Sequence, residues 1–142
     1  MPKDKLEQFD AHLGRVVSAL TNEGEVFDLI RQHTGFAFLK EFLPSPDRLL
    51  MLELSEPYVR QVLGGRREDY IGKTDFEVWD YSTASNFFSH DMKVIRGLPV
   101  ELDEHGRLNE PWESERTGLK GVFNGRKYRV DSKDRIFLVG LD

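Results

Sequence analysis

The chain has 142 residues, 39% of them apolar and 32% charged, which are the proportions of one globular domain rather than a disordered chain. Its formal net charge is −5 and it carries no long basic stripe, so we expect that it binds no nucleic acid. The absence of cysteine excludes disulfide bonds, thiolate nucleophiles and zinc–thiolate sites.

The first five residues, MPKDK, are charged where a secretory signal peptide needs an apolar run. No apolar stretch in the sequence approaches the ~20 residues of a membrane-spanning helix. We therefore expect a cytoplasmic protein that makes no membrane contact.

An amphipathic helix is expected at the start of the chain. Its apolar stripe covers about two heptads, which is short for an independent coiled coil. Two interpretations remain open: the helix packs on its own domain, or it forms the seam of a homodimer. The stripe follows a spacing of three and four residues and consists of Leu6, Phe9, Leu13, Val16 and Leu20.

A second helix is expected to begin near Asn22, because Asn22 followed by Glu25 is the pattern of a capping box. Gly35 fits the C-terminal end of that helix. These features divide the chain into an N-terminal helical extension, residues 1–34, which caps the domain or dimerises, and a domain over residues 35–142.

The middle of the chain predicts a hairpin followed by helices. Residues 36–42 are rich in aromatic side chains, and residues 50–54 alternate leucine with other residues, so both are predicted to be strands around a turn at 44–47. Helices are then expected over 57–63 and 82–96, with short helical turns between them.

The last third of the chain is expected to consist mostly of strands. Asn124-Gly125 is a hairpin-turn signal, because both residue types tolerate positive φ. Helices followed by an antiparallel set of strands predict an α+β fold with its helices segregated on one sheet. The candidate strands are 100–102, 112–117, 120–123, 127–131 and 136–141.

Four segments, in order, resemble the PAS family. The most specific is 70–76, YIGKTDF, which is similar to the family's eeliGktdfe segment. Residues 91–99 resemble the D-x-x-V-x-x-G-x-P end of its long helix. Residues 36–40 with the 50–54 strand look like its opening hairpin, and residues 140–142 resemble its exit toward an effector linker.

The resemblance implies a PAS-like five-stranded antiparallel sheet with helices on one face, here preceded by the N-terminal helical segment. Family members mostly serve as sensor or interaction modules, and their ligands or cofactors lie between the sheet and the helices. We therefore expect a sensory domain without enzymatic activity. It would bind a small molecule or a partner protein and relay the signal through its termini, by dimerisation or to an effector domain; the alternative is an interaction module without a ligand.

No motif in the sequence identifies a cofactor. The PAS family that the sequence resembles includes photosensors that bond a flavin or a yellow chromophore through a cysteine. The absence of cysteine excludes both kinds of photosensor. The spacing of the four histidines does not indicate a metal site, and His90 is expected on the solvent side of its helix.

The 82–96 helix carries the most informative side chains. At about 100° per residue, Phe87, Phe88 and Met92 share one broad apolar face, and Asp91 projects into its middle. A carboxylate in such a face must be paired, hydrogen-bonded or protonated. Three interpretations of Asp91 remain open: a structural ion pair, a polar anchor for a ligand, and the general base of a cone-shaped α+β enzyme.

The aromatic side chains near this helix either line a ligand cavity or fill the core. The candidate ligand-binding residues are Leu52, Leu54, Tyr58, Tyr70, Phe76, Trp79, Phe87, Phe88, Asp91 and Met92.

Overall fold

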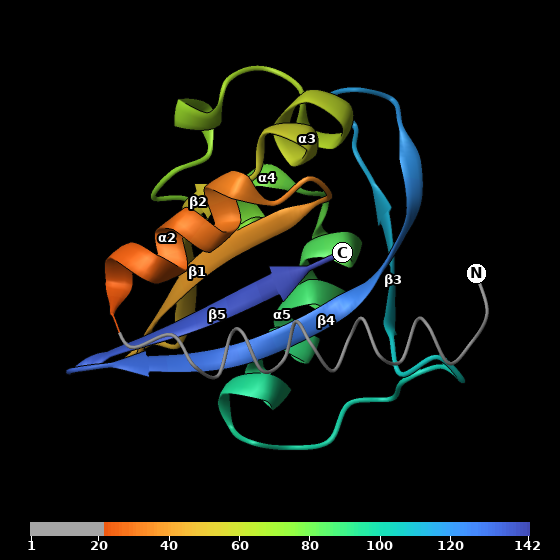
Figure 1. Cartoon of the computed structure of the whole chain (residues 1–142). Helices are drawn as coiled ribbons and strands as arrows, with labels where there is room; N and C mark the ends of the chain where they lie inside the picture. The colour runs from red at the N-terminus through yellow and green to blue at the C-terminus, as the bar shows by residue number, and fades with distance from the viewer. Residues whose placement is uncertain (1–21) are drawn as a thin grey trace.

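The computed structural model describes residues 22–142, which form one curled sheet with helices packed on it (Figure 1). The predicted helix with the stripe from Leu6 to Leu20 lies outside the described residues, so the homodimer seam expected there stays a prediction. None of the helices in the described part is long and apolar enough to cross a membrane.

All neighbouring strands of the sheet are antiparallel, and their order is β2-β1-β5-β4-β3 (Figure 1). The first and last strands along the chain, β1 and β5, are therefore neighbours near the middle of the sheet. This architecture confirms the predicted α+β class and the five-stranded antiparallel sheet. The strands are β1 (Ala37–Leu43), β2 (Arg48–Leu54), β3 (Leu108–Glu113), β4 (Lys120–Ser132) and β5 (Arg135–Leu141).

The helical elements lie where the sequence predicts them. Asn22 Oδ1 accepts a hydrogen bond from the Glu25 backbone N–H at 2.9 Å, which confirms the expected cap of the first described helix. The helical elements are α2 (Glu23–Gln32), α3 (Glu56–Tyr58), the π-helical turn η1 (Val59–Leu63), the 3₁₀ turn η2 (Arg67–Asp69), α4 (Asp75–Val78) and α5 (Tyr81–Ile95).

Helices cover both faces of the sheet. Successive side chains of a strand point to opposite faces, so neighbouring residues pack against different helices. Ala37 and Leu39 of β1 pack with Val26 and Ile30 of α2 on one face. Phe38, between them, packs toward the helices on the opposite face. Helices α3 to α5 thus share one face, as expected for the domain, while α2 covers the other.

Three strand predictions are wrong. The strand expected over 112–117 is β3, which begins earlier and ends at Glu113. Residues 100–102 form no strand, and Asn124-Gly125 is no turn, because β4 runs through it without interruption. Gly125 is needed there for a close approach: a Cβ at this position would lie 2.2 Å from the backbone oxygen of Leu141. The connection between β3 and β4 lies instead at 114–119, where Gly118 has a φ of 72°.

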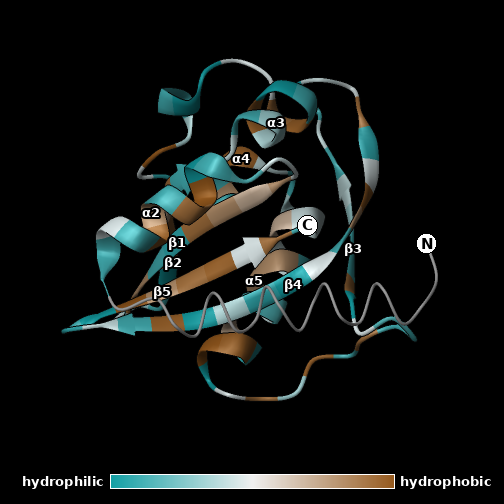
Figure 2. Ribbon diagram, in the orientation of Figure 1, coloured by the Kyte–Doolittle hydropathy of each residue, from teal (hydrophilic) through white to brown (hydrophobic). Residues whose placement is uncertain are grey.

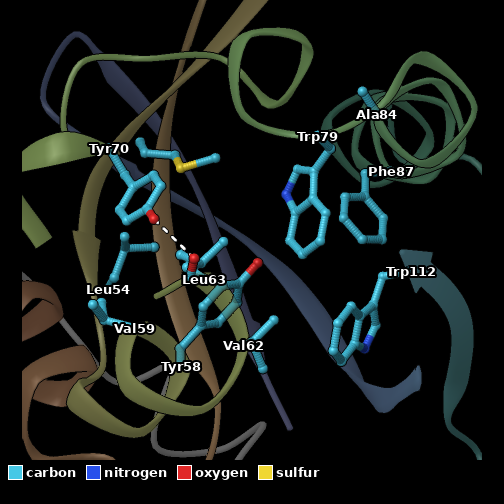
Figure 3. Packing of buried hydrophobic residues seen from close by; sticks show 11 residues of the cluster. Leu54, Tyr58, Val59, Val62, Leu63, Tyr70, Trp79, Ala84, Phe87 and Trp112 are labelled. Atoms are coloured by element: carbon cyan, nitrogen blue, oxygen red, sulfur yellow. Dashed lines mark hydrogen bonds between the residues drawn. The ribbon is translucent and has the colours of Figure 1, made fainter. Parts of the chain in front are cut away.

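The main core lies between the sheet and helices α3 to α5. Figure 2 shows hydrophobic residues along β1 and β5 and more hydrophilic ones along β4. Figure 3 shows how large side chains from several elements meet in this core. Several of its aromatic rings meet edge to face, as where the centroids of Trp79 and Phe87 lie 5.5 Å apart. This packing fixes α5 on the sheet.

Candidate functional site

Asp91 lies at the centre of the interface between α5 and the sheet, and its side chain is fully buried. Its Oδ2 is 2.7 Å from Lys40 Nζ on β1, and its Oδ1 is 2.5 Å from Lys127 Nζ on β4. Phe87 and Ile95, one turn to either side on α5, are buried with it. A structural ion pair is therefore present, and its partners are two lysines.

Both lysines have a second carboxylate partner. Lys40 Nζ lies 2.5 Å from Asp75 Oδ2 at the start of α4, and Lys127 Nζ lies 2.6 Å from Glu110 Oε2 on β3. Glu110 Oε2 is also 2.8 Å from His90 Nδ1 on α5. We call this continuous series the buried ionic chain: Asp75, Lys40, Asp91, Lys127, Glu110 and His90.

The alternation of the strands brings these charges inside. Lys40 stands between Phe38 and Phe42 on the same face of β1, and Glu110 stands between Leu108 and Trp112 on β3. Each charged side chain is therefore surrounded by apolar neighbours. No member is left unpaired, which is the condition under which buried charges are tolerated.

Aromatic rings flank the two ammonium groups. Lys40 Nζ lies 4.4 Å from the centroid of the Phe38 ring, and Lys127 Nζ lies 5.6 Å from that of Phe87. The negative faces of the rings attract the cations and replace part of the water that the ammonium groups lose on burial. The same rings exclude water from the ion pairs and so strengthen them.

Burial and ion pairing act in opposite directions on the pKa values of the groups in the buried ionic chain. Burial by itself would lower the pKa of Lys40, but the carboxylates of Asp75 and Asp91 outweigh it and raise that pKa above its ordinary value. Burial would raise the pKa of Asp91, yet Lys127 and Lys40 together hold it below the ordinary value. The Asp91 carboxylate is thus held in its ionised form.

The buried ionic chain reaches the surface of the protein at His90. Its side chain is 20% exposed, so the structure places it closer to the interior than the solvent-side position expected from the sequence. The buried ionic chain holds three carboxylates and two ammonium groups, and burial raises the pKa of one of these carboxyls, that of Asp75, above its ordinary value. Glu110, which contacts both His90 and Lys127, links this end to the interior.

Half of the predicted ligand-binding residues belong to one hydrophobic cluster. Tyr70 anchors that cluster, since its hydroxyl donates to the backbone oxygen of Leu63 at 3.0 Å (Figure 3). Their side chains pack against one another in the core and do not together line one ligand cavity. These residues are Leu54, Tyr58, Tyr70, Trp79 and Phe87.

The structure separates the other predicted residues. Leu52 packs with the cluster around α2 on the opposite face of the sheet, because the pairing register of β1 and β2 shifts at Leu39. Phe76 is 43% exposed, and its ring lies 5.6 Å from that of half-buried Phe88 on the surface of α5. Met92 is buried in a third cluster near the end of the helix.

The enclosed space between the sheet and the helices is small, although an open groove of about 1010 Å³ lies between the first half of α5 and the strands β3 and β4. The hollow beside Lys127 and Glu110, which Phe38 and Tyr58 also line, has a volume of about 30 Å³. Such a volume holds one or two water molecules. Pockets for small molecules usually span ~300–1,000 Å³. The hollow beside Lys127 is therefore too small for such a molecule.

Sequence reasoning missed four members of the buried ionic chain: Lys40, Asp75, Glu110 and Lys127. The signal for Lys40 is present, because Phe36, Phe38, Lys40 and Phe42 alternate in a predicted strand and so share one face. The signal for Glu110 was weaker, since the strand was predicted to begin at residue 112, after it.

The chain matches no model of a known protein family, and no curated protein matches it either. Among residues 22–142, no three His, Asp or Glu side chains are arranged so that they could hold a metal ion. Inference about function therefore depends on the fold, the buried ionic chain and the remaining hollows.

Proposed function

We propose that residues 35–142 form a PAS-type sensory module that binds a small molecule or a partner protein and relays the event through its ends. Two motifs of the resemblance lie on matching elements: residues 70–76 lead into α4, and residues 91–99 end α5. The five-stranded antiparallel sheet with α3 to α5 on one face supports the same proposal. A relay of this kind needs no catalysis by the chain.

The observation that carries the proposal is the contact between the two ends of the domain. The Asp142 backbone N–H donates to the Phe36 oxygen at 2.8 Å, and His33 Nε2 lies 3.0 Å from the Asp142 oxygen. His33 ends α2, so the helical extension joins the sheet where β5 leaves it. A shift of β1 against β5 therefore moves both ends together.

The interior connects to these ends. Lys127 and Glu110 of the buried ionic chain line the same small hollow as Leu141 and Asp142. A change in the ion pairs of Lys127 or Glu110 would thus alter the packing around the last residues of β5. A ligand shifts such an arrangement only by the difference in its affinity for the two states, and ~1.4 kcal/mol of difference gives a tenfold shift.

The receiver of the signal is proposed to be a second copy of the chain, held through residues 1–20, for which the sequence predicts a helix, or an effector or partner protein at the ends. Deleting residues 1–20 should change the oligomer seen by light scattering. An unchanged oligomer would contradict the homodimer and leave the effector or partner as the receiver.

A second candidate, an interaction module without a ligand, is favoured by one observation: the enclosed hollow behind Phe38 and Tyr58, of about 30 Å³, is too small for a ligand. The enzyme alternative finds less support, since both carboxylate oxygens of Asp91 are held by lysines and its side chain has no exposed surface. A general base has to reach its substrate directly or through one water.

The test is a metabolite screen on the full chain that follows turnover and thermal stability together, combined with native mass spectrometry. The sensory proposal expects a compound that raises the melting temperature without being converted, and an altered oligomer or altered protection of 33–36 in hydrogen exchange. Turnover that Asp91→Asn abolishes would overturn it in favour of the enzyme. Partner binding without any stabilising compound would favour the ligand-free module.

A further inference from the structure

A hollow of about 140 Å³ lies outside the interface between the sheet and the helices. It is enclosed by η1, η2, α4 and the 114–119 turn, and no residue of the five strands lines it. Its lining combines an apolar floor with a charged mouth. The lining residues are Leu63, Asp69, Tyr70, Lys73, Glu77, Val78, Trp79, Ser114 and Arg116.

Trp79 supplies a hydrogen-bond donor that nothing in the described part of the chain accepts. Its side chain is only 6% exposed, and its Nε1–H is buried without a partner among residues 22–142. Figure 3 shows the indole nitrogen on the edge of the ring that faces Tyr70, which also lines the hollow. Buried donors in proteins are nearly always satisfied, because an unmet one costs about 1–3 kcal/mol.

Two cations stand at the mouth of this hollow. The Arg116 guanidinium lies over the Tyr70 ring, 5.4 Å from its centroid, and makes a long ion pair of 3.5 Å with Asp69. The Lys73 side chain makes no ion pair with any residue in 22–142. Both side chains are exposed and keep donors that a ligand can use.

The carboxylates at the mouth already have partners. Asp69 Oδ2 accepts from the Arg66 backbone N–H at 3.0 Å, and Glu77 Oε1 accepts from the Thr74 backbone N–H at 3.1 Å, where it caps α4. The donors that remain unused therefore belong to Trp79, Lys73 and Arg116. Donors of this kind, two of them cationic, select an anionic acceptor.

We infer that this hollow binds the carboxylate group of a small organic acid. The carboxylate accepts from Trp79 Nε1–H and from Arg116 or Lys73, and the apolar body of the acid lies against Leu63 and Val78. A cavity of about 150 Å³ accommodates a molecule the size of benzene. The hollow of about 140 Å³ therefore holds propionate, and benzoate is the upper limit, with its ring inside and its carboxylate toward the charged mouth. This site supplies the ligand class of the proposed sensory function and rests on that function for its biological role only.

The two tryptophans of the chain make the test direct. The ¹⁵N-labelled full chain gives two indole N–H resonances, and Trp79→Phe identifies the one from Trp79. Titration with benzoate should move the Trp79 resonance to a saturating value. Benzamide, which has the same size and no charge, should bind at least about tenfold more weakly, because hydrogen bonds to charged groups are the stronger ones.

Variants locate the binding and separate it from a change of fold. Arg116→Gln and Lys73→Gln should each weaken benzoate by about tenfold without changing the melting temperature of the free protein. Lys93→Gln removes a comparable exposed charge on α5, away from the hollow, and should leave the affinity unchanged.

Each outcome decides between the alternatives. A Trp79 resonance that does not respond to benzoate into the millimolar range means that water alone fills the hollow, and it overturns the inference. Equal affinity for benzoate and benzamide does so as well. Saturable benzoate binding with no change in the oligomer or in the exchange of 33–36 would support the site and count against the sensory function instead.

Discussion

Lys127 Nζ and Asp91 Oδ1 lie 2.5 Å apart, and this contact fixes α5 to β4, the strand next to β5 in the sheet. Lys127 stands opposite Gly140 in the pairing of β4 with β5, and Lys40 stands opposite Leu138 in the pairing of β1 with β5. Asp91 therefore bridges the two strands on either side of β5. The last strand is held beneath the helix by charges that do not belong to it.

Lys127→Met is expected to destabilise the protein by about 3–5 kcal/mol, because it removes a cation from between two buried carboxylates. Asp91 would keep Lys40, but Glu110 would keep only His90. Urea unfolding followed by circular dichroism measures the loss. Lys93→Met on the exposed side of α5 is the matched control and should change stability by no more than about 0.5 kcal/mol. A loss for Lys127→Met as small as that of the control would mean that the buried ionic chain adds nothing to stability.

Phe87→Ala and Phe88→Ala should differ, although the two residues are neighbours on α5. Phe87 is 4% exposed and packs against Trp79, so its truncation should cost about 3–5 kcal/mol. Phe88 is half-buried and meets exposed Phe76, so its truncation should cost about 1–2 kcal/mol. Chemical denaturation of both variants checks the order. A larger loss for Phe88 would contradict the helix phase described here.

The elements that the sequence predicted correctly are those with a local signal. The 82–96 helix has an apolar face and ends at Gly97 and Pro99, and it appears as α5 within one residue at each end. The hairpin of β1 and β2 has alternating strands around the 44–47 turn. Asp91 was placed correctly in the interior for the same reason, because its position depends only on the period of its own helix.

The partners of Asp91 could not be predicted in this way. Lys40 and Lys127 are 51 and 36 residues distant along the chain, and their approach depends on how β1, β5 and β4 pair. Strand pairing is set by the whole sheet and not by a local pattern. The Asn124-Gly125 error has the same origin: the glycine serves the packing against Leu141 rather than a turn.

Gly125→Ala tests that correction. An added Cβ would lie 2.2 Å from the backbone oxygen of Leu141, which cannot move aside without disturbing β5. The variant should lose at least about 1–3 kcal/mol, as overpacked sites do. Gly24→Ala in α2 is the control, because its Cβ would meet only one atom, Oδ1 of the capping Asn22, and at 3.3 Å a small shift of that side chain relieves the contact. The stability of this variant should stay within about 1 kcal/mol of the parent protein. A tolerated Gly125→Ala would show that residue 125 has more room than the register of β4 allows.

Asp103 should make the loop before β3 sensitive to acid. Its Oδ1 accepts from the His105 and Arg107 backbone N–H groups at 2.8 and 3.0 Å, and the Arg107 bond foremost holds the pKa of Asp103 below its ordinary value of 3.8. A carboxyl whose pKa is lowered by folding stabilises the fold above its ordinary pKa, and this contribution is lost as the pH falls through the lowered value.

Asp103→Asn keeps the side-chain oxygen but cannot be ionised, so the melting temperature of the variant should fall less than that of the parent protein between about pH 6 and pH 3. The other carboxylates with lowered pKa values, such as Asp69 and Asp131, are present in both proteins and cancel in the difference. Asp134→Asn, at an exposed position without a hydrogen bond or ion pair in the described part of the chain, should show the full acid dependence of the parent. If the melting temperatures of Asp103→Asn and the parent protein fall in parallel with pH, this loop does not hold the Asp103 carboxylate in its ionised form. The acid sensitivity of the fold then arises elsewhere, and Asp91 with its two lysines is the first candidate.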